Sequence, residues 1–259
     1  DYQYIAEQYD RIDVERIIAT RTLLLSRYAT MLFDSFETVY LELSKVLVAG
    51  GAYSPDADSI AMRSLKNTCL SLLLYQGDEK HVVLAQRQYR DGDNMTDQFA
   101  ALAALVGSKT LAKSRTTSDM LEQFIVQWRG ESLVVNQWFS VQAASFALGT
   151  LDHIHALAEH DLFDKTNPNK VRSLLGAFAM RNFENFHRKD GAGYEYLADQ
   201  VIQLDSQNPQ LASRLLTPLT RWKRYDAHAS EQMKRALARI HAVEGLSADV
   251  FEIVEKSMV

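Results

Sequence analysis

Apolar residues recur at intervals of three and four along the whole chain, and this periodicity constrains the fold more than any other feature. Two stripes near the N-terminus illustrate it: Val14, Ile17, Ile18, Leu24 and Leu25, followed by Leu32, Phe36, Val39, Tyr40, Leu43 and Leu47. Such spacing places apolar side chains on one face of an α-helix, whereas a half-buried strand alternates apolar and polar residues. No segment alternates in that way, so the sequence predicts an all-α fold.

The prolines mark where helices are expected to begin. Each follows a residue that can cap a helix: Ser54-Pro55, Asn167-Pro168, Asn208-Pro209 and Thr217-Pro218. A capping side chain accepts a hydrogen bond from a backbone N–H of the first turn, and proline suits the first helical position because the N–H it lacks is not needed there. Helices should therefore begin at or beside these prolines. Further caps are predicted at Asn94, Ser118 and Ser247.

Glycines supply the expected helix ends. They lie at Gly50-Gly51, Gly77, Gly92, Gly107, Gly130, Gly149 and Gly245. Together the start and stop signals divide the chain into roughly a dozen helices joined by short loops, a pattern that favours antiparallel neighbours. The predicted architecture is an irregular superhelical array of antiparallel helix pairs, similar to HEAT and armadillo folds. Because no linker or low-complexity tract interrupts it, we expect a single helical domain over residues 1–259.

Charge and cysteine content restrict the classes of partner and the cellular location that are expected. The 28 Lys and Arg nearly balance the 33 Asp and Glu, so the chain has no positive electrostatic field that would bind a polyanion. Nucleic acid is therefore not an expected partner. No apolar run is long enough to cross a bilayer, so no membrane association is expected. The single cysteine, Cys69, cannot form an internal disulfide, which favours a cytoplasmic location. The chain begins at Asp1, without Met and inside an apolar-periodic stretch, so it is expected to be a segment of a longer protein.

No residue pattern predicts a catalytic centre or a complete metal site. The zinc motif His-Glu-x-x-His is absent. His155 and Glu159 could supply two ligands on one helix face, but solvated side chains are the stronger interpretation. Glu184 and His187 have the spacing used in di-iron bundles, which require that motif twice plus two further Glu. We therefore expect no catalytic residue, metal ligand set or cofactor in this segment.

Two proline-capped helices carry polar residues that a purely structural interpretation explains poorly. Lys170 and Arg172 follow Asn167-Pro168, where their charges oppose the helix dipole, so another interaction should hold them there. In the next such helix, Gln210 and Arg214 are four residues apart and share one face. Each set could be a solvated surface or could contact a ligand.

The same residues carry a family resemblance. The blocks occur in this order: Arg63-Ser64-Leu65-Lys66-Asn67-Thr68-Cys69, Asn94-Met95-Thr96-Asp97, Ala100-Ala101-Leu102, Asn167 to Phe178, Asp190-Gly191-Ala192-Gly193-Tyr194, Asn208 to Leu215 and Arg224-Tyr225-Asp226. As an ordered set they resemble the C-terminal domain of bacterial aminopeptidase N, one of the M1 metalloaminopeptidases, over nearly the whole chain. Phe183 departs from the pattern, because family members commonly have Pro after Asn182.

The resemblance implies a superhelix that closes over a thermolysin-like catalytic domain and encloses its active-site chamber. The enzyme would remove N-terminal residues from peptides, with zinc held by a His-Glu-x-x-His motif and a distant Glu, and with a Tyr stabilising the oxyanion. All of those residues belong to domains that this segment lacks. The resemblance also implies that Arg172, Gln210 and Arg214 lie on the inner surface and bind substrate.

The expected function is thus a C-terminal domain that encloses the substrate of a zinc aminopeptidase and is inactive alone. Its expected partners are the catalytic domain of the same chain and peptide substrates. The alternative is a free-standing helical-repeat scaffold that binds a protein or peptide in its concave face.

Overall fold

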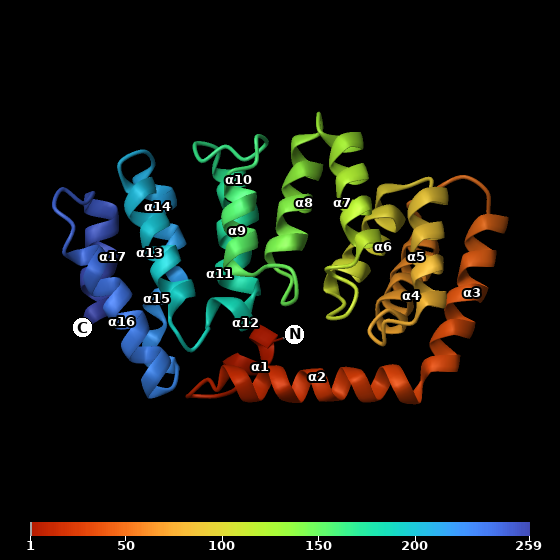
Figure 1. Ribbon diagram of the computed structural model, residues 1–259, viewed down its shortest axis with the longest axis horizontal. Coiled ribbons are helices and arrows are strands. Elements are labelled where there is room, and N and C mark those ends of the chain that lie inside the picture. The colour runs from red at the N-terminus through yellow and green to blue at the C-terminus, as the bar shows by residue number, and fades with distance from the viewer. Residues whose placement is uncertain (1) are drawn as a thin grey trace. The chain divides into compact units, whose positions relative to one another are not determined.

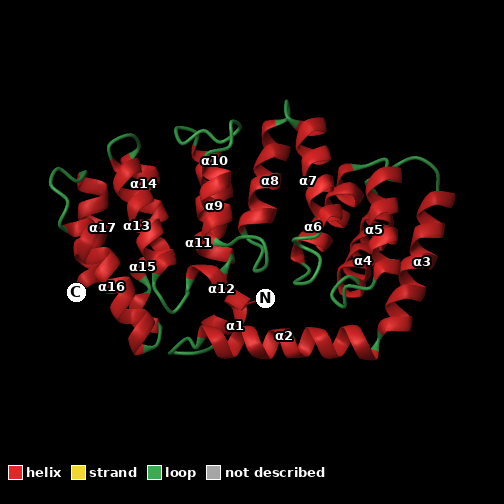
Figure 2. Ribbon diagram, viewed as in Figure 1, coloured by secondary structure: helices red, strands yellow, loops and turns green. Residues whose placement is uncertain are grey.

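The computed structural model describes residues 2–259, which form helices joined by loops and turns (Figures 1 and 2). No strand occurs among them, and the extended pairing within this range is an isolated parallel bridge between Ile12 and Tyr225. The predicted all-α fold class is confirmed.

The chain folds into two compact units, each with more contacts within itself than with the other. Unit 1 comprises residues 2–20 and Arg129–Val259, and unit 2 comprises Arg21–Trp128. The expectation of a single domain over residues 1–259 stays a prediction.

Unit 2 is built from antiparallel helices with a leucine-rich core. It contains most of α2 (Val14–Met31), followed by α3 (Phe33–Ala49), α4 (Ala57–Leu73), α5 (Glu79–Asp91), α6 (Met95–Gly107) and α7 (Arg115–Trp128). Helix α4 packs against both α3 and α6, and α5 packs against α6. Leu70, Leu73, Leu102 and Leu105 are completely buried between α4 and α6. These leucines belong to stripes of helical spacing, so the periodic sequence pattern forms the core.

Unit 1 has shorter helices and an aromatic core. After α1 (Tyr2–Glu7) its elements are α8 (Ser132–Ala143), α9 (Leu151–Ala158), α10 (Pro168–Val171), a π-helical turn (Arg172–Gly176), α11 (Ala177–Arg181), α12 (Phe183–Phe186), α13 (Ala192–Asp205), α14 (Pro209–Leu215), α15 (Thr217–Thr220), a 3-10 turn (Trp222–Arg224), α16 (Ala227–His241) and α17 (Ala248–Met258). Helix α13 packs against α14 and α16, and α16 packs against α17. Phe139, Phe178, Phe186 and Tyr194 are among its largest fully buried side chains.

The N-terminal segment of unit 1 is held against residues more than 170 positions away in the sequence. The Ile12 N–H donates to the Arg224 carbonyl at 2.5 Å, and the Arg224 guanidinium donates to the Tyr9 carbonyl at 2.7 Å. The ring of Tyr2 stacks on Phe183 with 3.7 Å between centroids. These contacts fix the chain that leads into α2.

Several predicted helix starts are confirmed. A side-chain oxygen of the capping residue accepts a backbone N–H at the start of α6, α10, α14 and α17, and the caps are Asn94, Asn167, Asn208 and Ser247. Pro168 and Pro209 are the first residues of their helices, as expected.

The predicted cap at Ser54 is wrong, although the helix does begin close to Pro55. Helix α4 begins at Ala57, and the Asp56 carboxylate accepts the Ser59 N–H at 2.9 Å. That hydrogen bond holds the pKa of Asp56 well below its ordinary value. The Ser54 carbonyl instead accepts the buried Arg63 guanidinium. Asp56 stands directly before the first residue of the helix, so its carboxylate, and not the Ser54 hydroxyl, accepts the first-turn N–H.

The predicted caps at Thr217 and Ser118 are also wrong. Thr217 is the first residue of α15, and its hydroxyl donates to the Arg214 carbonyl at 2.8 Å, which ties it to the end of α14. Helix α7 begins at Arg115, and Ser114 accepts the Thr117 N–H at 3.2 Å. Helix α15 thus begins at Thr217, beside Pro218 as predicted, but without a side-chain cap, whereas α7 begins three residues before Ser118.

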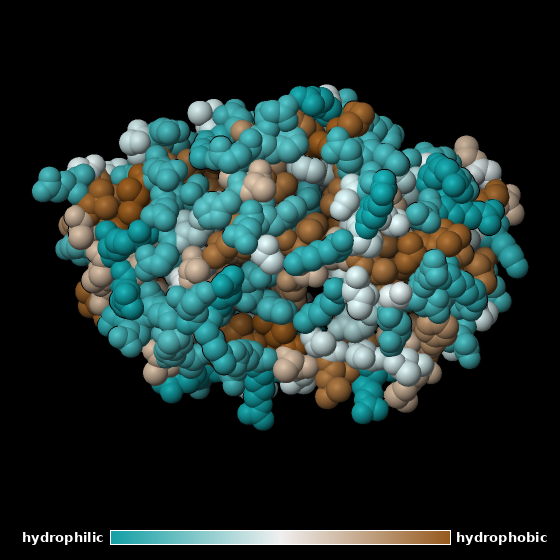
Figure 3. Space-filling model, in the orientation of Figure 1, coloured by the Kyte–Doolittle hydropathy of each residue, from teal (hydrophilic) through white to brown (hydrophobic). Residues whose placement is uncertain are grey.

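The surface is mainly hydrophilic on the face drawn in Figure 3, with apolar residues gathered in patches, including a band over the helices of unit 2. Among residues 2–259, no helix combines the length and apolar character needed to cross a lipid bilayer.

Candidate functional site

The helix that carries Arg172 begins normally and then widens. The Asn167 side chain accepts the Asn169 N–H at 2.9 Å, and Pro168 opens α10. From Arg172 to Gly176 the chain forms a π-helical turn, in which the Ser173 carbonyl accepts the Ser140 hydroxyl of α8 at 3.0 Å. Insertions of this kind are frequent at functional sites. No residue pattern in the sequence predicts this turn.

The two cations near the start of this helix have different environments. Lys170 is buried, with its Nζ 5.7 Å from the centre of the Phe139 ring, and desolvation lowers the pKa of this lysine. Arg172 is exposed, and its Nη1 donates to Asn169 Oδ1 at 2.9 Å. An aromatic ring and a neighbouring amide are therefore the interactions that hold these charges against the helix dipole.

Helix α14 presents Gln210 and Arg214 to solvent. The Asn208 side chain accepts the Leu211 N–H at 3.0 Å and sets the start of the helix. Leu211 and Leu215 are buried, whereas Gln210 and Arg214 are exposed on the neighbouring face, which they share because they are four residues apart. Among the described residues, no side-chain hydrogen bond or ion pair engages Arg214. Its guanidinium is therefore accessible to a ligand.

The three predicted substrate-binding residues share one unit but not one cluster. The N-terminal ends of α10 and α14 lie along the same edge of unit 1, the upper edge in Figure 1. Within residues 2–259, no hydrogen bond or ion pair connects Arg172 with Gln210 or Arg214. Their role in binding substrate stays a prediction.

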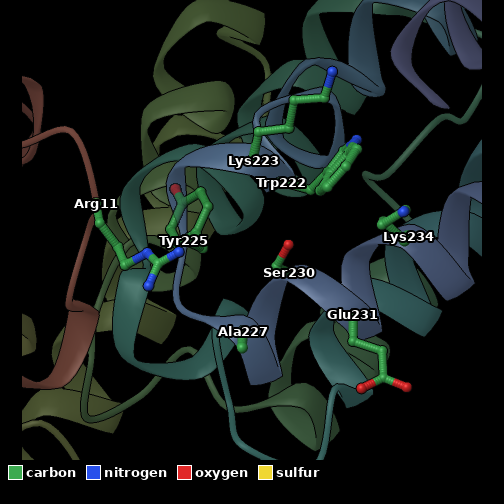
Figure 4. Close-up of a pocket in the computed structure, with 8 residues that line it drawn as sticks. All are labelled: Arg11, Trp222, Lys223, Tyr225, Ala227, Ser230, Glu231 and Lys234. Carbon is green, nitrogen blue, oxygen red and sulfur yellow. The ribbon is translucent and has the colours of Figure 1, made fainter. Parts of the chain in front are cut away.

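A shallow pocket of about 430 Å³ lies elsewhere in unit 1 (Figure 4). Its lining residues are Arg11, Trp222, Lys223, Tyr225, Ala227, Ser230, Glu231 and Lys234. The Trp222 indole donates to the Ser257 carbonyl at 2.8 Å, and the Nζ atoms of Lys234 and Lys223 lie 4.4 and 5.4 Å from its ring centroid. No sequence pattern predicts this pocket, because its walls come from segments far apart in the chain. Its cationic and aromatic lining contains no nucleophile paired with a base.

The candidate metal ligands have other partners. The His155 ring packs edge-on against Tyr196 at 4.6 Å, and His187 Nδ1 lies 2.9 Å from the Tyr194 hydroxyl. Cys69 is buried, and burial raises the pKa of its thiol. In the part of the chain that the structure describes, no three His, Cys, Asp or Glu residues converge as a metal site. The donor set that zinc requires is not assembled there.

A family model described as "Domain of unknown function (DUF3458_C) ARM repeats" matches residues 1–259. The chain belongs to this family. The description agrees with the helical array seen in the structure.

Relatives of this DUF3458_C chain are aminopeptidases. It is 36% identical over 254 residues to aminopeptidase N of Escherichia coli, and 37% identical over 253 residues to aminopeptidase N of Haemophilus influenzae. Each match covers 98% of this chain and 28% of the relative. The crystal structure of Legionella pneumophila aminopeptidase A in complex with aspartic acid superposes with a TM-score of 0.86 at 28% identity, over 100% of this chain and 30% of that one. The resemblance to aminopeptidase N is confirmed, and the chain spans less than a third of the length of these relatives.

Some residues that carry the resemblance form a buried network in the DUF3458_C chain. Lys66 Nζ of α4 lies 2.8 Å from Asp97 Oδ2 of α6, and Asn67 Nδ2 donates to Asp97 Oδ1 at 3.0 Å. The Gln88 amide of α5 donates to Asn67 Oδ1 at 2.8 Å and to the Asp97 carbonyl at 3.0 Å. These contacts join three helices of unit 2, so their role is structural.

A second polar junction surrounds Asn182 in unit 1. Its buried Nδ2 lies 2.8 to 2.9 Å from the carbonyls of Ala143, Ser145 and Gly149. The next residue, Phe183, departs from the family pattern, and its ring stacks on Tyr2. This ring contact links the junction to the N-terminal segment.

Proposed function

We propose that this chain is the C-terminal helical domain of an M1 zinc aminopeptidase that removes N-terminal residues from peptides. The observation that carries the proposal is the match of 98% of this chain to aminopeptidase N, at 36% identity. In this proposal the domain encloses the active-site chamber and contacts the substrate, and its partner is the catalytic domain of the same chain. We assign zinc to that catalytic domain, because the described residues of this segment do not fit a zinc site.

Arg172, Gln210 and Arg214 are the proposed substrate contacts. Their exposure supports this role, as does the absence of a competing carboxylate at either guanidinium among the described residues. A guanidinium can meet a carboxylate with two parallel hydrogen bonds, which suits recognition of a peptide whose N-terminus is engaged at the zinc. Gln210, one turn before Arg214, would add a neutral contact to the peptide backbone.

We further propose that the enzyme works in the cytoplasm, where a buried free thiol such as Cys69 remains reduced. The near balance of 28 basic and 33 acidic residues supports peptides, and neither nucleic acids nor membranes, as its partners.

The test is Arg214→Ala in the full-length enzyme. We expect kcat/KM for tripeptides to fall. The fall should correspond to a loss of about 1–3 kcal/mol of transition-state stabilisation, which is typical of a charge-assisted hydrogen bond. Aminoacyl amides should be nearly unaffected, because they are too short to reach this side chain. Arg181→Ala is a matched control, since Arg181 is an exposed arginine at the opposite end of the helical run that begins at Pro168. Equal losses on both substrate types would contradict substrate binding by Arg214.

A further inference from the structure

The C-terminal half of α2, within unit 2, turns an apolar stripe toward solvent. Leu24, Tyr28 and Met31 are 51%, 54% and 78% exposed. Spacings of four and three residues place them on one side of the helix. Leu32, directly after the end of the helix, is 41% exposed.

The opposite side of the same helix, with Thr22, Leu25 and Ala29, faces the body of unit 2. The Tyr75 hydroxyl donates to the Thr22 carbonyl at 3.3 Å, and the Gln76 amide donates to Thr30 Oγ1 at 2.7 Å. Ala29 is buried on this side. Hydrogen bonds at Thr22 and Thr30 thus hold the helix with the stripe of Leu24, Tyr28 and Met31 turned toward solvent.

Two arginines flank the apolar stripe. At 100° per residue, Arg21 and Arg27 lie on opposite sides of the line through Leu24 and Tyr28. Both are exposed, and no ion pair joins either one to another described residue. An apolar stripe between two available cations fits a partner surface with an apolar groove and an acidic rim.

We propose that this stripe, Leu24, Tyr28 and Met31, docks on the part of the aminopeptidase chain that lies outside this segment. This inference rests on the proposed function. The chain matches only 28% of the length of aminopeptidase N, so a much larger share of the relative's chain is available to cover the stripe.

A second copy of the chain is a poorer occupant. A two-fold interface through this stripe would place Arg21 and Arg27 near the same residues of the other copy. Like charges at the rim of an apolar contact oppose association. A lipid surface is also a poorer occupant, because the apolar side chains form a narrow line rather than the broad face of an interfacial helix.

The experiment places a photo-reactive benzoylphenylalanine at position 28 of the full-length enzyme and maps the cross-links by mass spectrometry. We expect cross-links within one polypeptide to residues outside this segment. Their yield should exceed by about fivefold that from the same group at position 133, because a docked anchor is held against its partner. Leu133 is the control, as it is 74% exposed on α8.

Three outcomes would overturn the inference. Cross-links mainly between two polypeptides would identify a second copy as the occupant. Cross-links to phospholipid in the presence of anionic vesicles, without a protein product, would identify a membrane. A yield at position 28 no greater than that at position 133 would show that nothing covers the stripe.

Arg21→Glu with Arg27→Glu in the cross-linking protein tests the charge argument, and a reduced yield is expected. An unchanged yield would remove the acidic rim from the proposal and so overturn it as stated. Peptide hydrolysis by the same preparations separates the two proposals. An active enzyme without the cross-link would refute the docking alone, whereas the cross-link in a protein that does not hydrolyse peptides would refute only the proposed function.

Discussion

Unit 2 joins helices α4 and α6 through a buried ion pair, whereas unit 1 joins α8 and α12 through a neutral amide. In unit 2 the Lys66 and Asp97 side chains are only 7% and 10% exposed. In unit 1, Asn182 satisfies three backbone carbonyls without any charge. Both arrangements satisfy buried polar groups where helices meet. They differ in the effect of removing one partner. A buried charge left without a partner lowers the free energy of unfolding far more than an unpaired amide does.

His187 is a second buried group of unit 1 that carries no charge. Its ring stacks on Tyr225 at 4.6 Å and its Nδ1 meets the Tyr194 hydroxyl. Desolvation among these rings lowers the pKa of His187 to about 3, although Asp226 acts in the opposite direction. The two units should therefore respond differently to mutation and to acid.

The largest expected effect is at the ion pair of unit 2. Asp97→Ala leaves the Lys66 ammonium buried without a partner, so the free energy of unfolding should fall by about 3–5 kcal/mol. Urea denaturation followed by circular dichroism measures the change. The double variant Lys66→Met with Asp97→Ala should lose less, because no buried charge remains. A double variant as unstable as the single one would show that the charge is not the cause.

Acid should affect unit 1 through His187. Since the pKa of the folded state lies below the ordinary value of 6.5, the unfolded chain binds the proton more readily. The contribution of neutral His187 to stability is therefore complete above about pH 6.5 and decreases as the pH falls toward 3. Between pH 7 and pH 4, the wild-type protein should lose about 3 kcal/mol more than His187→Phe, which cannot titrate. Denaturation curves at both pH values give this difference, and parallel losses in the two proteins would contradict it.

The smallest effects concern helix caps, which both units use. In unit 1, Asn208→Ala should cost about 1 kcal/mol, because the Leu211 N–H loses its acceptor, whereas Pro209→Ala should cost little. In unit 2, Asp56→Ala should destabilise the protein more than Ser54→Ala, because the carboxylate is the cap. Thermal denaturation of the four variants provides the comparison. A larger loss from Ser54→Ala than from Asp56→Ala would show that the cap is misassigned.

Local signals predicted much of the fold. The caps at Asn94, Asn167, Asn208 and Ser247 depend on a side chain and a backbone N–H within three residues of each other, so the sequence alone specifies them. The predictions failed where another group competed: Asp56 displaced Ser54 as the cap of α4, and the turn around Thr217 continued from α14. Such competition depends on backbone geometry that residue types do not reveal.

The candidate site was predictable only in part. The exposed face shared by Gln210 and Arg214 follows from their spacing. The π-helical turn at Arg172 and the pocket beside Trp222 had no sequence signal, because each depends on contacts between distant segments.

The sequence by itself determined the helical class, four of the helix starts and the resemblance to aminopeptidase N. Periodicity, capping and ordered motifs are properties of neighbouring residues, so they can be recognised without the fold. Only the tertiary structure decided which helical faces are buried. Lys170 is inside while Arg172 is outside, although they are two residues apart. Leu24 and Tyr28 form a proper apolar stripe that nevertheless faces solvent in the described chain. A helix specifies which side chains share a face, but packing against other helices decides where that face points.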